Sequence, residues 1–78
     1  MAWNVVDGHH LERTFTFPDF ASGLAFVNAV GALAEQHDHH PDVYLAWGKV
    51  RLELRTHSDS AITERDHALA DAIERIQR

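Results

Sequence analysis

Two prolines mark the places where the spacing of apolar residues changes along this chain. Before Pro18 and after Pro41, apolar side chains occupy alternate positions, which is typical of strands that bury one face. Between the prolines they recur with the period of an α-helix. Because the residue before a proline disfavours helical geometry, we expect Pro41 to stop this helix at about His37 or His39. Asp19 is the candidate N-cap.

The alternating segments predict four strands. A short strand from Trp3 to Val6 is followed by the turn signal Asp7-Gly8 and by a second strand from His10 to Phe17. Two further strands form a hairpin that reverses at Gly48, and their alternating apolar residues are Val43, Leu45, Trp47, Val50, Leu52 and Leu54.

A second helix is expected after this hairpin. Thr63 and Asp66 form a capping-box pattern, and the apolar stripe that follows consists of Leu69, Ile73 and Ile76. Residues 1–78 are therefore expected to form a single α+β domain in the order β-β-α-β-β-α. In this two-layer structure an antiparallel four-stranded sheet carries two helices packed on one face.

Two features of the pattern leave alternatives open. Arg13 shares the apolar face of its strand, which indicates either an edge position or an ion pair. The long helix carries two neighbouring apolar stripes, one of Phe20, Leu24, Val27, Gly31 and Ala34 and one of Phe26, Val30 and Leu33. One stripe can cover the sheet, and the other then needs a second partner, most simply another subunit. The alternative is a single wide core face.

Composition narrows the possible classes of protein. A monomeric core of 78 residues is expected to contribute only about 3–5 kcal/mol, and no cysteine is present to add disulfides, so we expect a homodimer or homotetramer. The formal charge of −5 with scattered basic residues argues against nucleic-acid binding. No apolar run approaches the roughly 20 residues that span a bilayer, and no secretion signal is evident, which predicts a cytoplasmic protein without a membrane partner.

A motif made mostly of ionisable residues at fixed intervals begins near the end of the long helix. Glu35 is followed after three residues by His39-His40-Pro41, after five by Trp47, after nine by His57 and after eight by Asp66. Imidazole has an unperturbed pKa of about 6.5, so clustered histidines indicate proton transfer. The spacing resembles the motif of the pterin-4a-carbinolamine dehydratase family at every position. The likeness extends upstream to the Trp3 segment and Arg13-Thr14-Phe15-Thr16-Phe17, and downstream through Thr63-Glu64-Arg65-Asp66.

The resemblance implies a hydro-lyase that dehydrates 4a-hydroxytetrahydropterin to quinonoid dihydropterin and water, with no cofactor. By carry-over, the groups around the C4a hydroxyl and N5 are His39, His40 and His57, with the acid and the base unassigned. Groups that tune these histidines or bind the pterin are Glu35, Asp38, Thr56 and Asp66. The hairpin supports this arrangement, because it returns the end of its second strand to the start of its first and so places His57 near His40.

Two alternatives to catalysis remain. Members of this family also act as dimerisation or assembly cofactors, so a non-catalytic pterin-binding or protein-interaction module is the second hypothesis. A metal site is the other, with His37, Asp38, His39 and His40 as possible ligands. Their spacings of two and three differ from the i, i+4 pair of a helical zinc site, and no cysteine is available, so no metal is expected.

The remaining aromatic and histidine residues are assigned to packing or to the surface. Trp3 and Trp47 are expected to pack. Outside the motif, the residues expected at the surface are His9, His10 and His67. Members of the family usually begin with an additional helix before the Trp3 segment, which this sequence does not show, and many carry an aromatic residue at the position of Val43.

Overall fold

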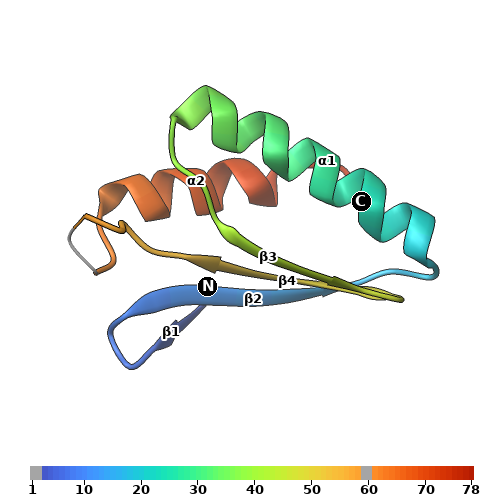
Figure 1. Ribbon diagram of the computed structural model, residues 1–78, viewed down its shortest axis with the longest axis horizontal. Helices are drawn as coiled ribbons and strands as arrows, with labels where there is room; N and C mark the ends of the chain where they lie inside the picture. The colour runs from blue at the N-terminus through green and yellow to red at the C-terminus, as the bar shows by residue number, and fades with distance from the viewer. Residues whose placement is uncertain (1–2, 59–60) are drawn as a thin grey trace.

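One four-stranded antiparallel sheet with two α-helices on one of its faces makes up the part of the chain that the computed structural model describes, residues 3–58 and 61–78 (Figure 1). The elements are β1 (Asn4–Val6), β2 (His10–Thr16), α1 (Phe20–His37), β3 (Asp42–Ala46), β4 (Lys49–Leu54) and α2 (Glu64–Glu74). The predicted α+β class and element order are confirmed. Neither helix is long and apolar enough to cross a membrane within these residues.

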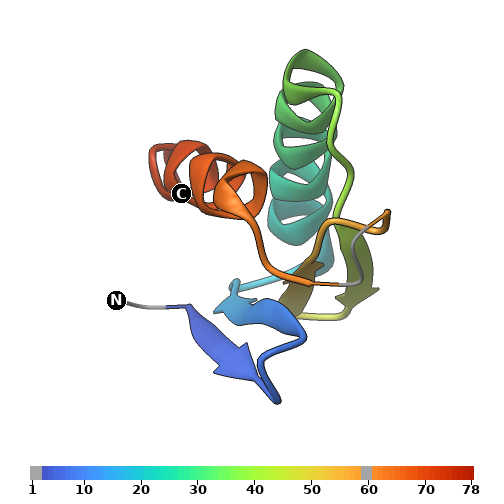
Figure 2. The same ribbon diagram turned by 90° about the vertical axis from the view of Figure 1, so that its left-hand side faces the viewer.

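The strand order β1-β2-β4-β3 places β2 and β4 at the centre of the sheet. They pair antiparallel from Leu11 opposite Leu54 to Thr16 opposite Lys49. Figure 2 shows both helices above the same face of the sheet, side by side. Alternate residues of the central strands point toward the helices and are buried there, namely Leu11, Phe15, Val50, Leu52 and Leu54. The other face carries the polar half of each strand.

The two hairpin turns use residues with positive φ. Asp7 and Gly8 have φ of 55° and 66° between β1 and β2, and Gly48 has φ of 77° between β3 and β4. The second turn ends the alternation of β3 at Ala46, so Trp47 lies in the turn with 73% of its surface exposed. The expectation that Trp47 packs is therefore wrong for the single chain. Trp3, in contrast, is buried as predicted.

Helix α1 begins and ends where the sequence predicts, but the residue that ends it is not the predicted one. Asp19 is the N-cap and accepts a 2.8 Å hydrogen bond from the Ser22 amide. The helix stops at Asp38, which adopts the left-handed conformation with φ of 48°. The His39 amide then donates back to the Ala34 carbonyl at 3.1 Å, the closing bond of a Schellman motif. The last helical residue, His37, is one of the two predicted ends, and the left-handed Asp38, rather than Pro41 itself, terminates the helix.

The two apolar stripes of α1 have different environments. The face toward the sheet is lined by Gly23, Phe26, Val30 and Ala34. The helix backbone approaches the sheet closely at Gly23, where an added Cβ would lie 3.3 Å from the Leu45 side chain. Phe20 and Leu24 are 43% and 42% exposed and are not covered by the described residues, whereas Val27 of the same stripe packs partly buried against the core. The core face of α1 therefore does not extend over Phe20 and Leu24. The grouping of Ala34 with the Phe20 stripe is wrong, because Ala34 lies with Val30 at the sheet.

Arg13 occupies a central strand, which excludes the edge-strand explanation for its position. Its guanidinium forms an ion pair with Glu74 at the end of α2 and lies 4.3 Å from the centroid of the Phe15 ring. The same Glu74 oxygen accepts a 2.9 Å hydrogen bond from the indole N–H of Trp3. The ion-pair alternative is therefore confirmed, and Glu74 connects β2 and the Trp3 segment to α2.

The N-cap of α1 predicts a defined dependence of stability on pH. The Ser22 backbone amide, and secondly the Ser22 side chain, hold the pKa of Asp19 below its usual value of 3.8. A depressed folded-state pKa contributes stability that is present above the unfolded value and is lost as pH falls through the folded value. We expect wild type to lose stability relative to Asp19→Asn as pH falls below about 3.8, measured by urea unfolding at a series of pH values. A difference that stays constant with pH would contradict this account.

Candidate functional site

The end of α1, the segment after β4 and the start of α2 meet at one end of the sheet and form a cleft of about 250 Å³. Its lining residues are Asp38, His39, His40, Thr56, His57, Ser58 and Arg65. The left-handed end of α1 sets where the first two histidines lie. A backbone pairing of Thr56 with Ala61 sets the position of His57. The structure therefore brings together the three histidines that the sequence motif separates.

A buried carboxylate lies behind the cleft. Asp66 is fully buried, and its Oδ1 accepts a 2.6 Å hydrogen bond from Nε2 of His39, itself only 7% exposed. Its Oδ2 accepts from the Thr56 hydroxyl at 3.0 Å and from the Thr63 amide at 2.9 Å. Both oxygens are therefore occupied by protein donors, as a buried charge requires. The capping box predicted for Thr63 and Asp66 is confirmed.

This arrangement fixes the His39 ring. Because Nε2 donates to Asp66, Nδ1 is the ring nitrogen that remains for another partner. A carboxylate that holds one imidazole nitrogen orients the ring and stabilises its protonated form, as in His–Asp pairs of known enzymes. The His39 ring is therefore held in one orientation by a buried carboxylate.

The other two histidines are more accessible. His40 forms an exposed ion pair with Glu35 of α1, and His57 is exposed in the turn after β4. Arg65, on the first turn of α2, donates a 2.6 Å hydrogen bond to the Asp38 carbonyl and so ties α2 to the end of α1. The cleft thus combines one buried imidazole, two exposed imidazoles and one guanidinium.

The candidate site residues differ in how they relate to the cleft. Five of them line it directly, namely Asp38, His39, His40, Thr56 and His57. Glu35 contacts His40, and Asp66 lies behind His39. Trp47, although it belongs to the motif, lies at the opposite end of the β3–β4 hairpin.

Sequence reasoning missed two residues of the cleft, Ser58 and Arg65. Arg65 precedes Asp66 in the capping box, and this position is the one signal that could have indicated it. His10 was wrongly assigned to the surface, because only 14% of its side chain is exposed, whereas His67 is exposed as expected.

The fold and the cleft define a class of small α+β proteins with a histidine cluster at one end of the sheet. Residues 1–76 match the family model described as Pterin 4 alpha carbinolamine dehydratase, and the chain belongs to this family. Several relatives carry the name "Putative pterin-4-alpha-carbinolamine dehydratase", and two of them illustrate the similarity. The one from Alkaliphilus metalliredigens is 43% identical over 96% of this chain and 68% of its own length. The one from Rubrobacter xylanophilus is 45% identical over 95% and 69%.

Solved structures agree with this membership. The crystal structure of a transcriptional coactivator/pterin dehydratase from Brucella melitensis matches with a TM-score of 0.87 and 35% identity, covering 94% of this chain and 79% of that one. A pterin dehydratase-like protein identified as a RuBisCO assembly factor in the α-carboxysome matches with a TM-score of 0.80. It covers 95% of this chain and 87% of the other, and at 24% identity it supports the fold alone.

Replacing Asp66 is expected to destabilise the whole domain. Asp66→Ala leaves the buried His39 and Thr56 without their acceptor, which should lower the free energy of unfolding by about 3 kcal/mol. Urea unfolding followed by circular dichroism measures the change. Asp71→Ala, at an exposed aspartate on the same helix, is the matched control and should change stability by less than about 0.5 kcal/mol. Equal effects of the two substitutions would disprove the role given to Asp66.

Proposed function

We propose that this protein catalyses the dehydration of a 4a-hydroxytetrahydropterin to the quinonoid dihydropterin. The observation that carries the proposal is the convergence of His39, His40 and His57 on one cleft, with His39 oriented by a buried carboxylate. Membership of the pterin carbinolamine dehydratase family supplies the substrate class. The reaction would take place in the cytoplasm, a setting that suits a chain without cysteine.

The chemistry requires two proton transfers. A donor protonates the hydroxyl on C4a, the carbon–oxygen bond breaks and water leaves. An acceptor removes the proton from N5, and the electron pair of that N–H bond forms the C4a–N5 double bond. Histidines near their own pKa can serve as either group, and one well-placed acid or base contributes about 10²–10⁴ in rate.

The geometry suggests separate roles for the carboxylates. Asp66 is fully buried with both oxygens occupied, so in this proposal it is a positioning residue that acts through His39. Glu35 stands in the same relation to His40, but is exposed and therefore also free to accept from a ligand. Asp38, at the wall of the cleft, is the proposed acceptor for the pterin amino group and ring nitrogens, and Thr56 is the proposed site of a backbone contact.

His40 is the most informative residue to change, because more than half of its side chain is exposed and the fold does not depend on it. His40→Ala should lower the acceleration of 4a-hydroxytetrahydropterin decay, followed by ultraviolet absorbance, by about 10²–10⁴. His67→Ala, at an exposed histidine on α2 outside the cleft, is the matched control and should keep the wild-type rate. Full activity in His39→Ala, His40→Ala and His57→Ala would refute the histidine mechanism.

The second candidate function is a protein-interaction module. The similar protein from Brucella is described as a transcriptional coactivator as well as a pterin dehydratase, which supports this candidate. The same assay separates the two functions. A folded wild type that does not accelerate the decay, but binds a partner protein as tightly as His40→Ala does, would support the protein-interaction module. Catalysis that depends on His40 supports the enzyme.

We further propose that the protein forms a homodimer or homotetramer through α1. The exposed Phe20 and Leu24 form an apolar surface on this helix, and burying such side chains stabilises an assembly by about 25 cal/mol per Å². Leu24→Glu should shift the mass measured by light scattering toward the monomer. Gln36→Glu adds the same charge about 120° around α1 from Leu24, at an exposed position, and should leave the mass unchanged. A wild type that is monomeric at all concentrations would refute this assembly.

A further inference from the structure

The open face of the sheet, opposite the helices, carries a row of three carboxylates. Glu12 of β2 lies directly opposite Glu53 of β4, and Glu53 lies directly opposite Asp42 of β3. Directly opposed residues of antiparallel strands have Cβ atoms about 4.5–5.5 Å apart on the same face, so like charges there destabilise the sheet. Arg51 compensates this row only in part, through Oε2 of Glu53.

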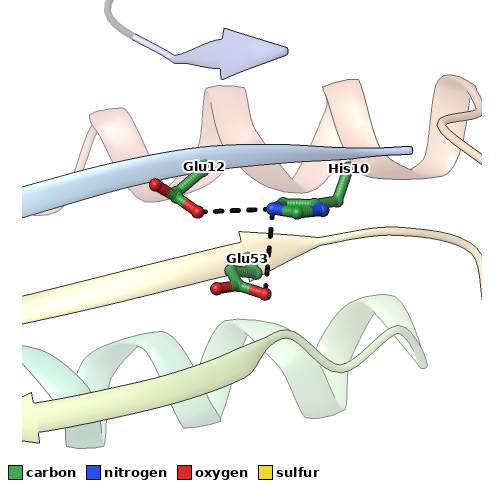
Figure 3. Close-up of side chains that lie close together, drawn as sticks. All are labelled: His10, Glu12 and Glu53. Atoms are coloured by element: carbon green, nitrogen blue, oxygen red, sulfur yellow. Dashed lines mark hydrogen bonds and ion pairs between the residues drawn. The ribbon is translucent and has the colours of Figure 1, made fainter. Parts of the chain in front are cut away.

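A histidine completes this group. Figure 3 shows the His10 ring pointing toward the carboxylates of Glu12 and Glu53 from the adjacent strands β2 and β4. Its Nε2 is 3.3 Å from Oε1 of Glu12 and 3.8 Å from Oε1 of Glu53. One ligand-type atom from each of the three side chains lies within 4.8 Å of the other two. This group uses none of the residues that line the histidine cleft.

These separations suit a tetrahedral metal ion. Nitrogen and oxygen ligands lie about 2.0–2.2 Å from zinc, and at the tetrahedral angle two such ligands are about 3.3–3.6 Å apart. The pair formed by His10 and Glu12 already has this separation, and the pair with Glu53 exceeds it by a few tenths of an ångström. One imidazole with two carboxylates is a ligand set that zinc accepts.

The surroundings of the three residues also suit a metal site. The side chains of His10, Glu12 and Glu53 are only 14%, 33% and 17% exposed, so solvent screens their charges incompletely. Nδ1 of His10 lies 3.0 Å from Nδ1 of His9. When Nδ1 of His10 donates in this hydrogen bond, its Nε2 carries no proton and its lone pair faces the carboxylates. Arg51 Nε lies 3.3 Å from the other oxygen of Glu53 and leaves Oε1 to face His10.

We propose that His10, Glu12 and Glu53 bind a zinc-like divalent cation on the open face of the sheet. Three protein ligands leave one coordination position for water or an external group. The bound ion joins β2 to β4 and compensates the opposed carboxylates. It therefore stabilises the sheet on the face that the helices do not cover.

Zinc binding by the full-length, untagged protein after chelator treatment tests the proposal. Titration calorimetry with zinc chloride should give one site per chain, and cobalt(II) should develop the strong visible absorption of a tetrahedral ion. Glu12→Gln preserves the shape of the side chain and should weaken zinc binding at least tenfold, since even the loss of a group that only orients a ligand costs about 10- to 100-fold. His40→Ala, which alters the histidine cleft, should leave the affinity unchanged.

Thermal unfolding supplies a second measurement. Zinc at about 100 times its dissociation constant should raise the melting temperature of wild type by about 10 °C or more, and Glu12→Gln should abolish most of this rise. Without zinc, Glu12→Gln should melt at or above the wild-type temperature, because it removes one of the opposed charges. This result would show that the variant is folded.

Three outcomes would overturn the proposal. The first is no zinc binding by wild type at millimolar concentrations. The second is binding that is lost in His40→Ala and kept in Glu12→Gln, which would locate the ion at the histidine cleft. The third is a zinc-induced rise in melting temperature that is equal in wild type and Glu12→Gln.

Discussion

The hydrogen bonds of the buried Asp66 carboxylate hold together the three segments that build the cleft. His39 follows α1, Thr56 follows β4 and Thr63 caps α2, and all three donate to this one side chain. A buried carboxylate without donors would be costly, so the three segments are constrained to meet where the donors reach it. The cleft is the surface that this meeting leaves open, and the orientation of His39 follows from the same bonds.

Most of the fold could be predicted from the sequence because it depends on local patterns. Alternating apolar residues predicted the sheet, and Asp19 and the Thr63–Asp66 capping box predicted where the helices begin. The end of α1 near His37 was predicted from Pro41, but the termination by Asp38 could not be, since an aspartate in the left-handed conformation leaves no pattern in the sequence. The exposure of Trp47 depends on whether alternation continues into a turn, which spacing alone does not decide.

The residues of the candidate site were predictable from their spacing, whereas their different environments were not. Adjacent histidines in the sequence, His39 and His40, have opposite environments in the structure, one buried against Asp66 and one exposed beside Glu35. This difference arises because His39 closes the Schellman motif and turns toward α2. The position of His10 beside two glutamates could not be predicted either, because it depends on the pairing of β2 with β4. Long-range pairing is the information that periodicity does not contain.

The ion pair and hydrogen bond at Glu74 have a consequence for how the chain folds. Trp3 and Glu74 are separated by 71 positions, so their contact closes nearly the whole chain into one loop. The entropic cost of such a closure must be met before the contact stabilises anything, and contacts of long sequence separation slow folding. The hairpins and helices can form by local contacts first. Docking of the Trp3 segment against the end of α2 is therefore expected to be a late step, completed only after α2 has been synthesised.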